Sequence, residues 1–295
     1  MSSRDLLSDQ AHRGPLVSVI ICTFNRANMI ARAITYVRNQ TYWNTEIIVV
    51  NDASSDNTDE VVKAISDERI RYIRHEKNKG LPAARNTGIK AAQGEYIAFL
   101  DDDDEWREDK LEKQLHVIKK FDAVLSDSLW NGRSRRLHRQ PMVSLDDLRK
   151  GSFASPTLLA KATVLKEVPF DESLRQGEDW DAFIRIAQRY SIGYVPEPLV
   201  ICNAGSHPRM TNEGKSQTGP ELEKRAAVLY KHRKFFGEKW FKYHLADNFL
   251  TYIGSRANRL HCIAYAVRRC GVMSVAAVLM AKLRRWLQGR MWTGA

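Results

Sequence analysis

Four consecutive aspartates, Asp101–Asp104, form the group of residues in this sequence with the most distinctive chemistry. They follow an apolar run, Tyr96–Leu100, whose length and composition predict a short buried strand. Like charges this close repel one another unless a cation neutralises them. Because carboxylate oxygens suit Mg²⁺ or Mn²⁺, the run predicts a divalent metal site that also binds a diphosphate. The simpler alternative is a solvated acidic turn, or the acidic first turn of a helix.

The segments around this run alternate between two periodicities. Strands are predicted at Val17–Cys22, Glu46–Val50, Ile70–Arg74, Tyr96–Leu100 and Ala123–Ser126. Helices are predicted after Asn25, which can cap one, after the SSDNTDE segment, at Leu81–Ala92, at Glu108–Phe121, and from Gly177 to about Tyr190. Such alternation indicates right-handed βαβ units and a parallel sheet. Ligands bind at the carboxyl ends of the strands in such sheets, and Asp101–Asp104 stand at one of these ends.

Two polar stretches interrupt the pattern, and the composition bounds the class of protein. Leu129–Leu145 and Gly205–Pro220 are predicted to be loops, the first of them mobile.

The chain has 295 residues, 43% of them hydrophobic and 27% charged, which is ordinary for a soluble globular protein. Its four cysteines show no metal-binding spacing, so we expect reduced thiols in the cytoplasm. We expect neither a signal peptide nor a membrane-spanning helix.

The net charge of +11 is concentrated in the last quarter of the chain. Residues 219–295 contain 15 Lys+Arg and 4 Asp+Glu, whereas the first 218 residues contain 31 of each. We therefore predict three parts: a flexible N-terminus at 1–14, an α/β domain at 15–218, and a basic helical segment at 219–295. Such asymmetry indicates an anionic partner, which is either nucleic acid or a membrane surface.

Three stretches together resemble glycosyltransferase family 2. They are VSVIICTFNRANMIARAITYVRNQTYWNTEIIVVNDASSDNT, NKGLPAARNTGIKAAQGEYIAFLDDDDEW and FDESLRQGEDWDAFIRIA, and the likeness covers roughly Pro15 to His207. The resemblance implies a GT-A fold, which is a Rossmann-like, mixed and mostly parallel sheet flanked by helices, here with a C-terminal helical extension. It departs from the family at Cys22 and Asn51, where a proline and a second aspartate are usual.

The resemblance also implies which residues bind the nucleotide. Thr23, Phe24 and Asn25 are expected to flank the base, and Asp52 to accept a hydrogen bond from uracil or another base. The alternative for Asp52 is a charge at a helix N-terminus. Arg85 is expected near the nucleotide, where it either binds phosphate or orients the acidic cluster.

Further roles concern the metal and the reaction. Asp103 is expected to coordinate Mn²⁺ or Mg²⁺ directly, and Asp101 to contact the ribose or a metal-bound water. Asp102 is expected to contact the nucleotide. Asp102 and Asp104 also stay open as metal ligands, because the run allows a shift of one residue. His207 is expected to reach the metal or the diphosphate, the alternative being a surface histidine. Asp179 is expected to be the catalytic base, with Glu178 and Asp181 as its rivals.

Trp106 and Trp180 are expected either to support the donor and acceptor pockets or simply to pack. The glutamine of the family's Q-x-x-R-W motif is missing from Leu283–Trp286, so we do not expect a processive polymer synthase.

The predicted function is therefore an inverting, metal-dependent transferase. It would move one sugar from a nucleoside diphosphate donor, expected to be UDP-linked, to a hydroxyl of a glycan or lipid-linked acceptor in surface polysaccharide assembly. Helices are predicted at Glu221–Phe236, Lys239–Ile253, Ser255–Arg268 and Val272–Leu287, and the last is basic and amphipathic enough to dock on the inner face of an anionic membrane. The alternatives are a nucleic-acid-binding protein that uses this tail, which lacks a recognisable binding motif, and a nucleotidyltransferase, whose glycine-rich loop is missing at Cys22–Ala27.

Overall fold

The computed structural model describes residues 14–130, 133–134, 140–202, 219–251, 253 and 258–291. The chain forms two compact units, Met1–Gly205 and Ser206–Ala295. The domain boundary predicted between residues 218 and 219 stays a prediction, because residues 203–218 lie outside the described part of the chain. The predicted loop at Gly205–Pro220 and the predicted flexible N-terminus lie almost entirely outside it as well.

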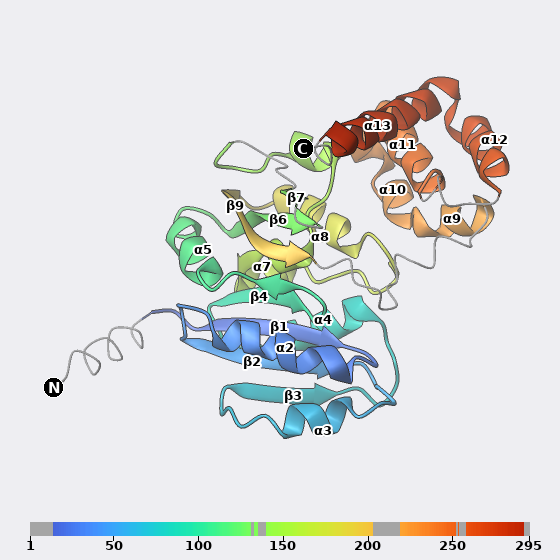
Figure 1. The fold of residues 1–295 in the computed structure, drawn as a ribbon. Coiled ribbons are helices and arrows are strands. Elements are labelled where there is room, and N and C mark those ends of the chain that lie inside the picture. Colours follow the sequence, from blue (N-terminus) through green and yellow to red (C-terminus); the bar gives the residue numbers. More distant parts are fainter. Residues whose placement is uncertain are drawn as a thin grey trace. The chain divides into compact units, whose positions relative to one another are not determined.

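The first half of unit 1 follows the predicted alternation of strands and helices. Its elements are β1 (Val17–Thr23), α2 (Ala27–Arg38), β2 (Thr45–Asn51), α3 (Thr58–Lys63), β3 (Ile70–Arg74), α4 (Leu81–Ala91) and β4 (Tyr96–Asp101). The four strands pair in parallel in the order β3-β2-β1-β4 (Figure 1). The apolar residues of β1, β2 and β4 are buried, since helices cover the sheet, and they belong to the hydrophobic core, whereas β3 is only partly buried.

The second half of unit 1 adds shorter and partly antiparallel elements. They are β5 (Glu105–Trp106), α5 (Lys110–Ile118), β6 (Ala123–Trp130), β7 (Arg133–Ser134), α6 (Leu145–Lys150), the 3₁₀ turn η1 (Ser155–Thr157), β8 (Leu159–Lys161), α7 (Ala162–Glu167), α8 (Glu178–Ala187) and β9 (Ile192–Cys202). The sheet continues from β4 through β8, β6 and β9 to β5, and β7 pairs with β6. β8 runs antiparallel to both β4 and β6, so the sheet is mixed, as the fold class predicts.

Pairing in register brings the candidate residues to one edge of the sheet. Cys22 of β1 lies opposite Asp101 of β4, and Thr23 lies opposite Asn51 of β2. Asp52 follows directly after β2. Because these strands are parallel, their carboxyl ends meet at the edge where ligands bind in open α/β sheets.

Three local predictions were wrong. Asn25 does not cap α2: the N-cap is Arg26, and Asn25 instead has a φ of 52° and accepts a hydrogen bond from the Ser55 backbone N–H at 2.7 Å. The loop predicted from Leu129 begins later, because β6 extends to Trp130 along its partner β9. The sequence analysis also missed β8 and β9, whose short or proline-containing runs have no clear alternation of their own.

Unit 2 is helical in its described part. It contains α9 (Gly219–Arg225), α10 (Ala227–Lys231), α11 (Arg233–Phe249), α12 (Arg259–Cys270) and α13 (Val272–Met291). Gly237, with a φ of 65°, interrupts α11 close to the predicted break between the first two helices. α11 packs against both α12 and α13, and α12 packs against α13. The helical C-terminal extension is thus confirmed, although its first predicted helix is divided into shorter pieces.

Gly94, just before β4, is a position where the strand backbones approach too closely for a side chain. A Cβ there would lie 2.7 Å from both the Leu16 carbonyl oxygen and the Ser18 backbone nitrogen. Those atoms belong to the backbone beside β4 and cannot rotate away. We therefore predict that Gly94→Ala lowers the free energy of unfolding by about 1–3 kcal/mol, the usual cost of overpacking.

Gly151→Ala is the matched control, because a Cβ at Gly151 would have no atom within 4 Å. Urea unfolding of both variants measures the difference. Equal shifts for the two variants would mean that the start of β4 moves freely enough to admit a methyl group.

Candidate active site

A tight turn after β4 gathers three of the four aspartates. The Asp104 backbone N–H donates to the Asp101 carbonyl at 3.1 Å, which closes the turn. Carboxylate oxygens of Asp101, Asp103 and Asp104 lie within 4.8 Å of one another. Opposite ligands of an octahedral Mg²⁺ are about 4.2 Å apart, which is comparable with this spread. The donor set consists only of oxygen atoms and fits Mg²⁺ or Mn²⁺.

Asp102 is not part of this trio and fastens the turn to the loop after β1, whose Arg26 also lies 3.5 Å from Asp103. Its carboxylate accepts hydrogen bonds from the Thr23 hydroxyl at 2.8 Å and from Arg26 at 2.5 Å. Burial raises the pKa of Asp102 to about 6, against the opposing effects of Arg26 and Thr23. Thr23 and Asp102, both predicted to contact the nucleotide, therefore bond to each other in this structure.

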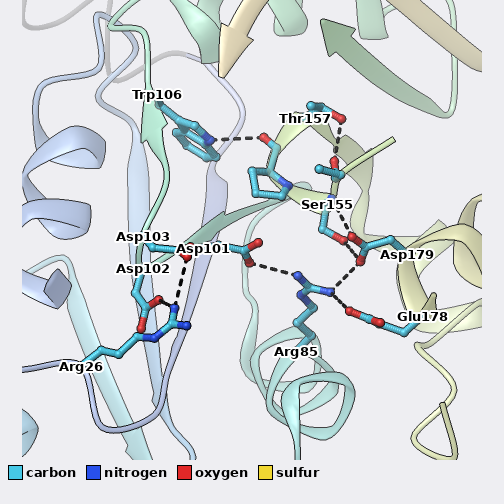
Figure 2. Close-up of polar contacts among 12 residues, drawn as sticks. Arg26, Arg85, Asp101, Asp102, Asp103, Trp106, Ser155, Thr157, Glu178 and Asp179 are labelled. Atoms are coloured by element: carbon cyan, nitrogen blue, oxygen red, sulfur yellow. Dashed lines mark hydrogen bonds and ion pairs between the residues drawn. The ribbon is translucent and has the colours of Figure 1, made fainter. Parts of the chain in front are cut away.

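Arg85 of α4 connects the acidic turn after β4 to the candidate base. Its guanidinium lies 3.0 Å from Asp101, 3.1 Å from Glu178 and 2.6 Å from Asp179 (Figure 2). Its side chain is only 2% exposed, and it lies over the ring of Phe170. Burial alone would lower the pKa of Arg85, but the three carboxylates outweigh that effect and raise it. Arg85 therefore remains charged and holds acidic groups from two distant segments together.

The start of α8 presents Asp179 and hides its two rivals. Asp181 is fully buried and pairs with Arg185 at 2.6 Å. Glu178 is 9% exposed, and burial together with the neighbouring Asp179 raises its pKa to about 7. The Asp179 side chain is 23% exposed. It is thus the most accessible of the three carboxylates to a substrate hydroxyl.

Ser155 holds Asp179 in one orientation. Its backbone N–H donates to Asp179 Oδ2 at 3.1 Å, and its hydroxyl donates to Oδ1 (Figure 2). The turn that carries Ser155 is fastened in turn by the indole N–H of Trp106, which donates to the Pro156 carbonyl at 3.2 Å. The sequence analysis missed Ser155, because no motif places a serine at a fixed distance from the acidic pair. Trp106 supports the site through this contact, while Trp180 donates to the Leu148 carbonyl.

Asp52 fastens the loop that leads into α4. Its carboxylate accepts hydrogen bonds from the backbone N–H groups of Lys79 at 2.9 Å and Gly80 at 2.7 Å, and lies 2.7 Å from His75 Nδ1. Among the described residues, only the Gly80 N–H donates to Oδ2, so this oxygen keeps capacity for one more donor, such as the imide of a base. His75 was also missed, since a lone histidine carries no pattern.

The remaining predicted residues are placed as follows. Phe24 lies at the same edge and is 44% exposed, and Asn25 beside it is tied to the loop after β2. His207 lies outside the described residues, so its role stays a prediction. The structure thus brings Asp52, Arg85, Asp101, Asp103 and Asp179 to one edge of the sheet.

The family model and two relatives that match this chain are all described as glycosyltransferases. The sequence model described as "Glycosyl transferase family 2" matches residues 18–160. A putative colanic acid biosynthesis glycosyl transferase, WcaA of Escherichia coli, is 33% identical over 188 residues, which cover 60% of this chain and 67% of the relative. WfaP of Escherichia coli, a UDP-Glc:alpha-D-GlcNAc-diphosphoundecaprenol beta-1,3-glucosyltransferase, is 34% identical over 151 residues, 51% of this chain and 56% of the relative.

Some relatives are much longer than the matched region. An uncharacterized glycosyltransferase of Rickettsia bellii is 35% identical over 208 residues, which cover 65% of this chain but only 29% of the relative. The chain spans about a third of the length of two further Rickettsia relatives.

Solved structures share the fold at lower identity. Residues 1–349 of S. aureus TarS, in complex with UDP-GlcNAc, align with a TM-score of 0.61 and 18% identity over 91% of both chains. The mannosyltransferase PcManGT of Pyrobaculum calidifontis, in complex with GDP-Man and Mn²⁺, aligns with a TM-score of 0.61 and 19% identity over 96% of this chain and 84% of that one.

Removing the positive charge of Arg85 is expected to destabilise the fold. We predict that Arg85→Met lowers the free energy of unfolding at pH 7 by about 3–5 kcal/mol, because Asp101, Glu178 and Asp179 would face one another without a positive charge. Urea unfolding without added metal measures this loss. Arg189→Met is the control, since its 55% exposed side chain makes a surface ion pair with Glu167 and should matter little. Similar losses for both variants would contradict the central role of Arg85.

The raised pKa of Glu178 gives a pH dependence with a definite sign. The folded protein keeps the Glu178 proton up to about pH 7, whereas the unfolded chain loses it near the ordinary value of 4.5. The free energy of unfolding therefore falls as the pH rises through this window. We predict that Glu178→Gln removes this fall and gains on the order of 1–3 kcal/mol relative to the parent between pH 5 and pH 8.

Unfolding in urea across this pH range measures the gain. Glu76→Gln, at an exposed glutamate, should show no comparable pH-dependent gain. A difference between Glu178→Gln and the parent that stays constant with pH would contradict the interpretation.

Proposed function

The chain belongs to glycosyl transferase family 2, and we propose that it transfers a single sugar from a nucleoside diphosphate donor to a hydroxyl group, with inversion at the anomeric carbon. The observation that carries this proposal is the arrangement around Arg85. Asp101, one member of the all-oxygen trio, and the accessible carboxylate of Asp179 lie on the same guanidinium, at the ligand-binding edge of the sheet. A transfer from a diphosphate to an alcohol needs both of these groups close together.

The first half of the reaction is the departure of the diphosphate. Asp101, Asp103 and Asp104 would hold Mn²⁺ or Mg²⁺, with Asp103 our first choice for direct coordination. When bound, the ion would neutralise the charge that builds up on the leaving diphosphate. Asp102 does not compete for the ion in the present arrangement, because Thr23 and Arg26 occupy both of its oxygens.

The second half is the attack of the acceptor. Asp179 would take the proton of the acceptor hydroxyl as its oxygen attacks the anomeric carbon, a contribution of about 10²–10⁴-fold in rate. Ser155 and Arg85 fix the orientation of this carboxylate. Attack from the side opposite the diphosphate inverts the anomeric centre.

We propose that the donor is UDP-linked. Asp52 Oδ2 can accept one further hydrogen bond, which a uracil imide N–H supplies, and Phe24 offers an exposed ring beside it. The name of WfaP gives UDP-Glc as its donor, and TarS was solved with UDP-GlcNAc. PcManGT was solved with GDP-Man, so the fold also accepts another base.

We propose that the acceptor is a lipid-linked glycan in surface polysaccharide assembly, reached from the cytoplasmic side. The names of WcaA and of TuaG from Bacillus subtilis refer to colanic acid and teichuronic acid biosynthesis, and that of WfaP to a diphosphoundecaprenol acceptor. Within the described residues, no helix is both long and apolar enough to cross a membrane. The enzyme would therefore meet such an acceptor at the membrane surface.

Donor hydrolysis without an acceptor tests this function. We expect the purified protein with Mn²⁺ to release nucleoside diphosphate slowly from one member of a panel of nucleotide sugars. EDTA and Asp103→Ala should each lower the release at least a hundredfold, because both remove metal binding. Asp179→Asn should leave the donor Kd within about threefold while lowering transfer by about 10²–10⁴-fold.

Asp146→Asn is the control, at an exposed carboxylate of α6, and should behave like the parent. Absence of binding and turnover with every donor, or release that EDTA does not affect, would overturn the proposed function.

A further inference from the structure

The end of the chain has an unusual charge pattern. From Asn248 to Ala295 there is no Asp or Glu, whereas there are eight Lys and Arg residues. This stretch contains α12 and α13, so the positive charge of unit 2 is not balanced within these two helices. A segment of one sign attracts a partner of the opposite sign.

The same two helices also expose apolar side chains. Of the eleven large hydrophobic residues that are exposed in the described part of the chain, seven lie between positions 260 and 287. The exposed fractions of the five residues Met273, Met280, Leu283, Trp286 and Leu287 range from 47% to 83%. Apolar side chains gathered in this way mark an interaction site rather than ordinary surface.

Helical geometry places four of these side chains on one face of α13, whereas Trp286 lies nearer the face that carries Val275 and Lys282. Met273, Met280 and Leu287 are spaced by seven residues, two turns apart, and Leu283 lies between the last two. The opposite face is already used, because Val275 and Val278 are buried and Lys282 pairs with Asp247 of α11 at 2.8 Å. The helix is therefore apolar on two faces, and the packing of α13 against α11 and α12 covers only one of them.

We propose that the exposed face of α13 docks on a membrane surface that contains anionic lipid, with the helix lying in the interface. Met280, Leu283 and Leu287 would enter the boundary between headgroups and acyl chains. Arg284 and, on α12, Arg268 are exposed and would bind the lipid phosphates. The docking does not depend on catalysis, but its purpose, to bring the site to a lipid-linked acceptor, rests on the proposed function.

Two other occupants fit the observations less well. Nucleic acid would use the positive charge, but methionine and leucine side chains make no favourable contact with phosphates. A second copy of the chain would cover the apolar face, but it would bring two uncompensated basic segments together, and like charges across an interface are unfavourable. An anionic membrane satisfies both the apolar and the basic side chains.

Vesicle co-sedimentation of the full chain tests the proposal. We expect binding to vesicles of phosphatidylglycerol and phosphatidylcholine that is at least tenfold stronger than binding to phosphatidylcholine alone and that weakens with salt. Met280→Ser with Leu283→Ser should lower the partition coefficient about tenfold or more, since apolar area no longer leaves water. Arg268→Gln with Arg284→Gln should lower it by about fivefold for each charge removed.

Matched controls come from unit 1. Met142→Ser with Leu145→Ser removes one exposed methionine and one exposed leucine, and Lys63→Gln with Lys90→Gln removes two exposed charges. Both double variants should bind vesicles like the parent. Circular dichroism should show that all four double variants remain folded, and donor hydrolysis should be unchanged in the two α12–α13 variants.

The outcomes separate docking from catalysis. Absence of binding to anionic vesicles at low salt, or equal binding by the α13 variant and its control, would overturn the docking proposal even if donor hydrolysis stands. A shift of RNA or DNA at physiological salt that Met280→Ser with Leu283→Ser leaves intact would assign the basic charge to nucleic acid instead. A dimer in light scattering that the same variant abolishes would assign the face to a second copy. Vesicle binding without donor hydrolysis would leave the docking in place and remove the proposed function.

Discussion

The ion pairs of Arg85 are the interaction on which the rest of the site depends. Asp101 ends a strand, whereas Glu178 and Asp179 begin a helix more than seventy residues later, and one buried guanidinium contacts all three. Without it, these carboxylates would repel one another in a partly dry environment. Arg85 is itself placed by the start of α4, which Asp52 fastens through the backbone of Lys79 and Gly80. These contacts thereby connect the ends of β2 and β4 to the start of α8.

A second set of contacts connects the acidic turn to Asp179 by another route. Trp106 lies two residues after that turn, and its indole N–H donates a hydrogen bond to the Pro156 carbonyl oxygen. The side-chain amide of Gln114 in α5 donates a hydrogen bond to the neighbouring Thr157 carbonyl oxygen at 2.8 Å. The same short turn presents Ser155 to Asp179. The orientation of Asp179 is therefore determined by packing around the acidic turn as well as by Arg85, which is the kind of rigid support that its proposed catalytic role needs.

The two units divide the work that the proposed function requires. Unit 1 has a balanced charge and the groups for metal-assisted transfer, while the end of unit 2 has positive charge and exposed apolar side chains without acidic residues. Several acidic residues of unit 1 pair with basic ones, as Asp67 does with Arg69 and Asp181 with Arg185, and Asp101, Asp103 and Asp104 form the candidate metal site. On these helices Lys282 pairs with Asp247 of α11 and Arg269 with Glu223 of α9, but α12 and α13 carry no acidic residue of their own, and the proposed membrane would supply the further negative charge.

The sequence by itself determined the strands β1 to β4, the helices between them, and the family. These depend on apolar runs, helical periodicity and motifs, all of which are local properties. It also indicated Asp101, Asp103 and Asp179, but it left the register of the four aspartates and the rivals of Asp179 open. Only the tertiary structure showed where the competing side chains lie: Asp102 is hydrogen-bonded to Arg26 and Thr23, and Asp181 is buried. It also supplied β8, β9, Ser155 and His75, because each of these depends on partners far away in the chain that no local pattern records.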